Sequence, residues 1–244
     1  MIKNLKHTLQ AVANARRAEL IPVVYHFTQG TVQTGPFSGM TVLPYYMWGD
    51  GDTAAKLLGE YENELHPYLE LAIQADPDVV INVGCAEGYY AVGLGGKTKA
   101  RIYAADIESS AQRICQANAA ANGVSVELHG EVNPISLRGM IADHQRPLIV
   151  SDCEGYEDEL LDLKVCPELD RCMILVETHD NVKPGLTDDI KKRFSKTHSV
   201  VKIRQNKKNP YQFPWLDQFG DCDKWALVHE GRPQLGHWLW MEPK

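Results

Sequence analysis

The stretch that decides the fold is residues 79–90, which read VVINVGCAEGYY. A mainly apolar run, residues 79–83, enters a Gly-x-x-x-Gly turn, and a helix-like segment follows. This order predicts a buried parallel strand that passes through a tight turn into a helix, as at nucleotide sites. Gly84 permits a sharp turn of the backbone, and Gly88 permits a ligand or a strand to approach the start of the helix closely.

An acidic residue closes the next apolar run. Residues 102–105 predict a second strand, and Asp106 follows it, 22 residues after Gly84. In nucleotide-binding units a ribose-binding carboxylate stands roughly 20 residues beyond the glycine turn. A strand, a glycine turn and a second strand that ends in an acid together predict a cofactor that contains a nucleoside.

The composition of the turn favours a cofactor without phosphate. A dinucleotide fingerprint needs Gly-x-Gly-x-x-Gly so that backbone amides can hold a pyrophosphate. Here Cys85, Ala86 and Glu87 separate the two glycines, and Glu87 would place a negative charge beside that group. S-adenosylmethionine carries no phosphate and has a zwitterionic amino acid part, so it fits this turn better. The alternative is a strand–turn–helix unit that binds nothing.

The composition is that of a globular protein without membrane segments. The chain has 244 residues, 44% of them hydrophobic and 23% charged, which suits one large α/β domain or two small ones. We expect no membrane association, because no apolar run approaches about 20 residues. The six cysteines form no Cys-x-x-Cys pair. We therefore expect a cytoplasmic protein with reduced thiols, no zinc site and no disulfides.

The charge is unevenly distributed. The net charge of −7 argues against a nucleic-acid partner and favours a small-molecule partner. Residues 191–208, however, contain eight Lys and Arg residues and no acid. This basic segment is either the solvated face of a helix and an edge strand or a strip that contacts phosphates.

The order of predicted elements indicates a doubly wound sheet. Residues 4–19 predict a helix, residues 21–49 short strands and turns that include residues 23–25, and residues 53–73 a second helix. From residue 79 onward strands alternate with helices, which predicts a Rossmann-like α/β fold. Residues 1–75 are expected to form an N-terminal helix/strand extension that packs on the core and could cover the substrate. Residues 76–244 are expected to form the cofactor-binding core. Seven strands are expected, the last antiparallel: 79–83, 102–105, 124–128, 148–152, 172–177, 199–204 and 237–241.

Acidic side chains follow several of these strands. Asp152 and Glu154 come at the end of the fourth strand, and Glu177, His179 and Asp180 at the end of the fifth. Since the carboxyl ends of parallel strands meet at one edge of a sheet, these side chains are expected to share one rim with Asp106. Packing explains acids at such positions poorly.

Three motifs resemble the FkbM-type S-adenosylmethionine-dependent methyltransferases. They are residues 82–90 (NVGCAEGYY), residues 152–157 (DCEGYE) and residues 176–179 (VETH), and residues 58–62 (LGEYE) resemble the helix before the first motif. The resemblance covers about residues 57–200. It implies a seven-strand class I methyltransferase fold and methylation of oxygen on sugars or natural products. The chain departs from many members at Asn82, where they have Asp.

With this resemblance we expect S-adenosylmethionine as the cofactor. The residues expected to bind it are Asn82, Gly84, Cys85, Ala86, Glu87, Gly88, Tyr89, Asp106 and Asp152. The residues expected to be catalytic are His179, Asp152 and Glu177. His179 would be the general base, because histidine titrates near neutral pH. Asp152 and Glu177 would orient it or bind the acceptor.

Several alternatives stay open. We expect no metal, but Asp152 and Glu177 with Glu154 or Asp180 would suit Mg²⁺, which prefers oxygen ligands. Glu154 and Glu157 could instead cap a helix. Two aromatic groups either belong to a satellite core or line an acceptor pocket. They are Tyr45, Tyr46 and Trp48, and Tyr211, Phe213 and Trp215. RNA as the methyl acceptor and a non-catalytic binding protein with the same fold are the two alternative functions.

Overall fold

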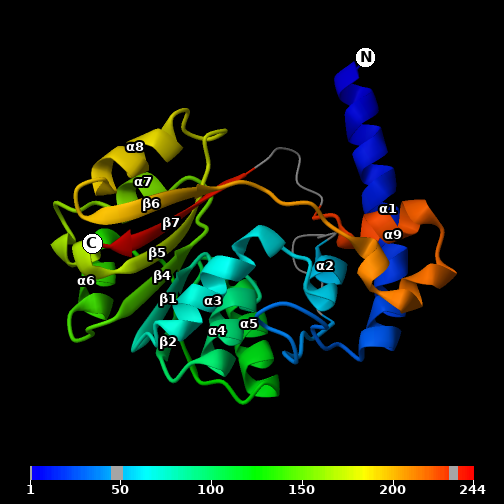
Figure 1. The fold of residues 1–244 in the computed structure, drawn as a ribbon, viewed down its shortest axis with the longest axis horizontal. Coiled ribbons are helices and arrows are strands. Elements are labelled where there is room, and N and C mark those ends of the chain that lie inside the picture. Colours follow the sequence, from blue (N-terminus) through cyan, green and yellow to red (C-terminus); the bar gives the residue numbers. More distant parts are fainter. Residues whose placement is uncertain (1, 45–51, 231–235) are drawn as a thin grey trace. The chain divides into compact units, whose positions relative to one another are not determined.

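The computed structural model describes residues 2–44, 52–230 and 236–244. The chain divides into two compact units. One comprises residues 1–63 and 206–234, and the other comprises residues 64–205 and 235–244. The second unit contains the whole sheet (Figure 1).

The sheet has seven strands in the order β3-β2-β1-β4-β5-β7-β6. They are β1 (Val79–Val83), β2 (Arg101–Ala105), β3 (Val126–His129), β4 (Pro147–Ser151), β5 (Met173–Thr178), β6 (His198–Ile203) and β7 (His237–Pro243). The pairs among β1 to β5 are parallel, and β7 is antiparallel to both β5 and β6. This confirms the predicted α/β fold with an antiparallel last strand. The structure adds that β7 lies between β5 and β6, so that β3 and β6 are the two outer strands.

Helices cover both faces of the sheet (Figure 1). The helical segments at the start of this unit and within it are η1 (Asn63–Leu65), α3 (His66–Gln74), α4 (Tyr89–Lys97), α5 (Ser109–Ala121), α6 (Pro134–Ile141), α7 (Glu157–Leu160), η2 (Pro167–Arg171) and α8 (Leu186–Phe194). One face carries α6, α7 and α8, and their apolar side chains join those of the central strands in a single cluster. The opposite face carries α3, α4 and α5: α4 packs on β1 and β2, and Tyr68 of α3 contacts the ring of Trp240.

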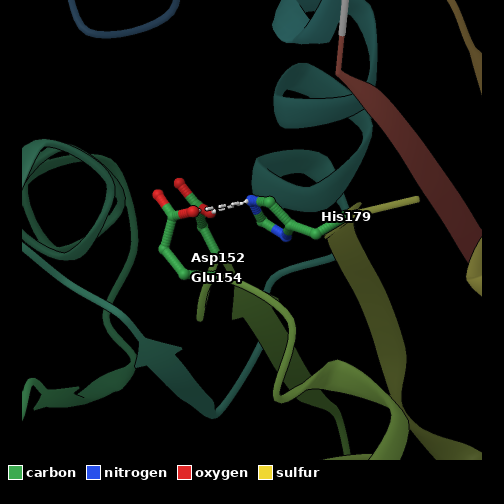
Figure 2. Close-up of side chains that lie close together, drawn as sticks. All are labelled: Asp152, Glu154 and His179. Atoms are coloured by element: carbon green, nitrogen blue, oxygen red, sulfur yellow. Dashed lines mark ion pairs between the residues drawn. The ribbon is translucent and has the colours of Figure 1, made fainter. Parts of the chain in front are cut away.

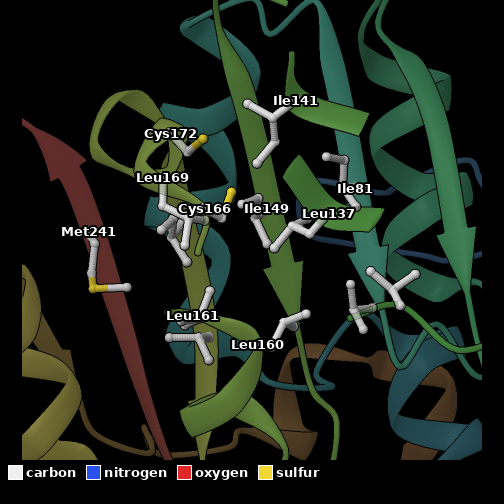
Figure 3. Close-up of a cluster of buried hydrophobic side chains, with 14 of the residues drawn as sticks. Ile81, Leu137, Ile141, Ile149, Leu160, Leu161, Cys166, Leu169, Cys172 and Met241 are labelled. Carbon is white, nitrogen blue, oxygen red and sulfur yellow. The ribbon is translucent and has the colours of Figure 1, made fainter. Parts of the chain in front are cut away.

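The main hydrophobic core lies between the sheet and α6, α7 and α8. Ile81 and Ile149 extend from the middle strands, and Leu137 and Ile141 of α6 pack against them (Figure 3). All five residues of β1 and of β4 are buried, because both faces of these strands are covered by helices. A parallel strand buried on both faces needs an almost continuous apolar run, and residues 79–83 supply one in which Asn82 is the single polar residue.

The first unit is mainly helical. It contains α1 (Ile2–Thr28), α2 (Thr53–Leu58), η3 (Pro210–Gln212), η4 (Pro214–Gln218) and α9 (Asp221–Val228). The predicted strand at residues 23–25 is wrong, because α1 continues to Thr28. The buried residues Leu20, Ile21 and Val24 recur with a helical period, so tertiary packing outweighs the β propensity of these residues. Among residues 29–44, which follow α1 and are described, the predicted strands are reduced to one bridge between Thr31 and Thr41.

The predicted helix over residues 53–73 is interrupted. Helix α2 ends at Gly59, which has a φ of 78°. A Cβ atom there would lie 2.2 Å from the carbonyl oxygen of Thr34. The close approach of the Thr34 backbone therefore requires glycine and ends the helix, and α3 starts afresh at His66.

The two aromatic groups were expected to belong to a satellite core or to line a pocket. Tyr45, Tyr46 and Trp48 lie outside the described residues. In the other group Phe213 is buried, Tyr211 is half exposed, and Trp215 stacks on Phe27 with 4.9 Å between ring centroids.

The basic segment is partly engaged with acids. Lys208 forms an ion pair with Glu230, which is buried, and it donates to the carbonyl oxygen of Glu60 at 2.6 Å. Arg193 pairs with Asp158 at 2.5 Å and donates to the carbonyl oxygen of Leu161 at 2.8 Å. Two of the eight basic side chains, Arg193 and Lys208, therefore form structural contacts with other segments of the chain. Within the described ranges, no helix has the length and apolar character needed to cross a membrane.

The turn after β1 generates a prediction about stability. A Cβ atom on Gly84 would lie 1.7 Å from the carbonyl oxygen of Asp152, and the φ of Gly84 is 76°. Gly123 is a matched control, since its φ is 64° but no described atom lies within 4 Å of such a Cβ. We expect Gly123→Ala to cost about 1–2 kcal/mol from its backbone conformation alone. Gly84→Ala should cost about 3 kcal/mol or more, because the backbone must also shift. Urea unfolding followed by circular dichroism measures both, and equal losses would contradict the packing argument.

Candidate functional site

The strand register brings the predicted site residues to one edge of the sheet. Val83 pairs with Ala105 of β2 on one side and with Ser151 of β4 on the other. The residues that follow them, Gly84, Asp106 and Asp152, therefore stand at the same level beyond the carboxyl ends of the strands. The backbone amide of Asp152 donates to the carbonyl oxygen of Val83 at 2.9 Å, which extends the β1–β4 pairing to this edge.

The glycine turn satisfies its own amide groups. Four of them donate within the protein: Gly84 and Cys85 to the carbonyl oxygen of Ala105, Ala86 to Asp106 Oδ2, and Gly88 to the carbonyl oxygen of Cys85, all at 2.7–2.9 Å. A pyrophosphate site needs such amides free to point at the ligand. The turn offers none of these four, so its geometry agrees with a cofactor that carries no phosphate.

Asp106 supports the turn in addition to facing the edge. Its Oδ2 accepts from the amide of Ala86 and its Oδ1 from the amide of Glu108, both at 2.9 Å. A carboxylate has about four acceptor positions. The half-buried side chain therefore keeps positions for a ribose hydroxyl while it holds the turn in place.

The other residues expected to bind the cofactor are more enclosed. Asn82 is 1% exposed and donates from Nδ2 to the carbonyl oxygen of Val150 at 3.2 Å, so its side chain lies inside the sheet unit. Cys85, Glu87, Gly88 and Tyr89 are buried as well. Within the turn, Gly84 and Ala86 are the half-exposed residues. A ligand at this edge would therefore meet mainly backbone and Asp106.

A second cluster lies at the ends of β4 and β5. His179 follows β5, and its Nε2 atom faces two carboxylates from the turn after β4 (Figure 2). The Nε2 atom lies 3.6 Å from Asp152 Oδ1 and 3.4 Å from Glu154 Oε2. Glu177, the penultimate residue of β5, contributes Oε2 at 3.8 Å. The structure thus brings the three residues expected to be catalytic together, and it adds Glu154.

Glu157 binds the other ring nitrogen of His179, Nδ1. Its side chain is fully buried, and Oε1 lies 2.8 Å from His179 Nδ1. The same oxygen accepts from the backbone amides of Cys153 and Gly155, both at 3.2 Å. Glu157 therefore ties the turn after β4 to the end of β5. It was expected only as a helix cap, although the signal for a second role was present in the DCEGYE motif, which begins with Asp152.

Burial and mutual repulsion determine the protonation of the cluster. Burial, followed by the charge of Asp152, raises the pKa of Glu177 far above its usual range. Burial also raises the pKa of Asp152, although a hydrogen bond with Glu177 opposes this. Each of these close carboxyl groups disfavours the ionised form of the other, and burial acts in the same direction.

The neighbouring carboxylates raise the pKa of His179 as well, and this favours its charged form. Burial alone would lower the pKa of His179, but the hydrogen bond to Glu157 and the charges of Glu157, Asp152 and Glu154 together raise it. Burial likewise opposes the charge of Glu157, yet the hydrogen bond with His179 holds the pKa of Glu157 below its usual range. The carboxylates around the ring therefore favour its protonated form. A general base at this position must first lose that proton.

Asp180, an alternative metal ligand, has another task. It accepts from the amide of Thr187 at 3.1 Å and from its hydroxyl at 2.5 Å, at the start of α8. The donors that do come together are Asp152, Glu154 and His179, with one ligand atom each within 4.8 Å of the others. This set contains a nitrogen donor and differs from the all-oxygen set expected for Mg²⁺.

Comparisons with known proteins identify the fold. No protein-family model and no curated protein matches the sequence. Among solved structures, the O-methyltransferase TomG from Streptomyces achromogenes, involved in tomaymycin synthesis and solved with S-adenosylmethionine, is 12% identical. The match covers 73% of this chain and 80% of that chain, with a TM-score of 0.50. An O-methyltransferase from Bacillus cereus, solved with S-adenosylhomocysteine, is 11% identical, over 94% of this chain and 91% of that chain, also with a TM-score of 0.50.

These neighbours are S-adenosylmethionine-dependent methyltransferases. At such low identity the likeness shows the fold and no residue roles. The chain therefore has the Rossmann-like fold of class I methyltransferases, with the glycine turn and the His179 cluster at the edge where such sheets bind ligands.

The pairing of Glu157 with His179 generates a prediction about titration. Glu157→Gln keeps the shape of the side chain but removes its negative charge. Because that charge stabilises the imidazolium, the pKa of His179 should fall. An NMR titration of the histidine rings in buffer with a chelator measures this. His198, which is buried and bonded to the carbonyl oxygen of Cys172 at 2.9 Å, serves as the internal control and should not change. An unchanged or higher pKa of His179 would contradict the assigned role of Glu157.

Proposed function

We propose that the chain is an S-adenosylmethionine-dependent methyltransferase that methylates a hydroxyl oxygen of a small molecule. One observation carries this proposal. The turn at Gly84 packs directly on the backbone of Asp152, where a Cβ atom would be 1.7 Å from the carbonyl oxygen. A cofactor on the turn would therefore lie next to the cluster of acids and histidine. Methyl transfer needs this adjacency, because the nucleophile, the methyl carbon and the sulfur atom must stand in line.

The cofactor half of the proposal rests on the turn and on Asp106. Four amides of the turn are satisfied internally, which favours a ligand without phosphate. Asp106 stands at the strand end where a ribose diol is usually held. Asp152 and Glu154, which lie near His179, also suit a positively charged sulfonium.

The acceptor half rests on His179, Asp152 and Glu177. In the reaction the acceptor oxygen forms a bond to the methyl carbon, and the carbon–sulfur bond breaks with its electron pair remaining on sulfur. The hydroxyl proton must leave, so a nearby group has to take it up. We propose that these three side chains bind the hydroxyl group and that one of them takes its proton.

The acceptor class follows from charge and from the motifs. The resemblance of residues 82–90, 152–157 and 176–179 to FkbM-type enzymes supports an acceptor such as a sugar or a natural product. The net charge of −7 and the engagement of Arg193 and Lys208 with acids weigh against RNA. We also propose that residues 1–75 contribute to acceptor selection.

Calorimetry with S-adenosylhomocysteine tests the cofactor half. Asp106→Asn keeps one acceptor oxygen for the turn but removes the charge that a ribose diol would meet. We expect the affinity to fall by roughly 10- to 150-fold, the equivalent of about 1.5–3 kcal/mol. Asp143→Asn, at an exposed residue after α6, is the matched control and should bind like the wild type. Failure of the wild type to bind at about 1 mM ligand would refute the proposed function.

Methyl transfer to a panel of hydroxylated small molecules, with labelled S-adenosylmethionine, tests the acceptor half. For an accepted substrate we expect His179→Ala to lower kcat by about 10²–10⁴-fold. Its affinity for S-adenosylhomocysteine should stay close to that of the wild type, because His179 lies on the acceptor side. If His179→Ala and Asp106→Asn lose cofactor binding equally while their circular dichroism stays native, the assignment of Asp106 to the cofactor and His179 to the acceptor is wrong. Cofactor binding with no product across the panel would favour the non-catalytic alternative.

A further inference from the structure

Asp152, Glu154 and His179 direct one donor atom each toward a common point (Figure 2). The Nε2 atom of His179 lies 3.6 Å from Asp152 Oδ1 and 3.4 Å from Glu154 Oε2. Both separations are longer than an ordinary hydrogen bond of about 2.9 Å. They are close to the roughly 3.3 Å that separates two ligands in a tetrahedral shell with bonds of about 2.0 Å. The spacing therefore suits atoms that share an ion better than atoms that bond to each other.

One of these atoms, Asp152 Oδ1, is buried, and no hydrogen bond from a described residue reaches it. The hydrogen bond of His179 to Glu157 uses Nδ1, and Nε2 contacts carboxylates at ion-pair distances of 3.4–3.8 Å. Buried polar atoms are normally satisfied, because leaving them bare costs free energy. A cation at this point would satisfy Asp152 Oδ1 and would separate it from the other two donors.

Glu157 prepares the histidine for such a role. The hydrogen bond from Nδ1 to Glu157 at 2.8 Å directs Nε2 at the two carboxylates, and a bound cation would replace the proton that Nε2 otherwise carries there. Metal-binding histidines commonly have a carboxylate on the other ring nitrogen, which orients the ring and strengthens the nitrogen as a donor. The full burial of Glu157 keeps this orientation rigid.

We propose that Asp152, Glu154 and His179 bind a divalent first-row transition-metal ion. A mixed set of one imidazole nitrogen and two carboxylates suits Mn²⁺ or Zn²⁺, whereas Mg²⁺ and Ca²⁺ prefer oxygen donors alone. The side chain of Glu154 is 83% exposed, so the ion is open to solvent on that side. Sites with three protein ligands and an open position bind water or a substrate.

The role of this ion rests on the proposed methyl transfer, although the site itself does not. A hydroxyl oxygen bound at the open position would become more acidic. Its proton would pass to an adjacent carboxylate or to water, and the resulting oxygen would attack the methyl carbon as its bond to sulfur breaks. His179 then acts as a ligand and not as the base.

Titration of chelator-treated protein with Mn²⁺, followed by electron paramagnetic resonance without any cofactor, tests the site. We expect one Mn²⁺ per chain. Asp152→Asn and His179→Ala should each weaken binding by at least about tenfold. Glu154→Gln should also weaken binding, and its exposed side chain leaves the core untouched. His144→Ala is the matched control, since His144 Nδ1 lies 3.8 Å from Asp78, which precedes β1 at the opposite edge of the sheet.

Three outcomes would overturn the proposal. They are no bound Mn²⁺ at about 1 mM, equal binding by the wild type and the three variants, and displacement of Mn²⁺ by equimolar Mg²⁺. Displacement by Zn²⁺ would support it. Calorimetry with S-adenosylhomocysteine is run separately on the same protein. Metal binding without cofactor binding would leave this site standing and refute the methyltransferase. Cofactor binding without metal binding would refute this metal site and leave the proposed methyltransferase standing.

Discussion

The close approach of the Gly84 turn to the backbone of Asp152 is the constraint on which the rest of the site depends. Because a side chain at residue 84 would collide with that carbonyl group, β1 and β4 can end side by side only with glycine there. The turn then reaches Asp106 on its other side through the amide of Ala86. The contact between Gly84 and Asp152 thus determines how closely the glycine turn approaches the cluster around His179.

The cluster around His179 concentrates unfavourable electrostatics at that edge. Asp152 and Glu177 are hydrogen-bonded carboxyl groups, and both have raised pKa values because burial penalises their charged forms. Glu157 is fully buried, and its Oε2 accepts no hydrogen bond from any described residue. Such groups lower stability, and here the apolar core beneath β4 and β5 offsets their cost. Strained electrostatics on a well-packed support is typical of functional sites.

The two compact units differ in how their polar groups are used. In the unit with residues 1–63 and 206–234, buried ions are paired for structure, as Lys208 and Glu230 are. In the sheet unit, four acids lie within 4 Å of one histidine: Asp152, Glu154, Glu157 and Glu177 around His179. Paired ions neutralise each other, whereas an excess of acid attracts a cation. This contrast distinguishes the ends of β4 and β5, where acids outnumber bases around His179.

The sequence by itself determined the strands, their parallel arrangement and the edge that carries the site. A continuous apolar run marks a strand buried on both faces, and a strand end followed by an acid marks the rim, so both signals are local. Tertiary structure alone decided that residues 23–25 are helical, because their burial follows the period of α1. It also placed β7 between β5 and β6, and it paired Glu157 with His179 across 22 residues. These features depend on contacts between distant segments, which neither propensity nor periodicity encodes.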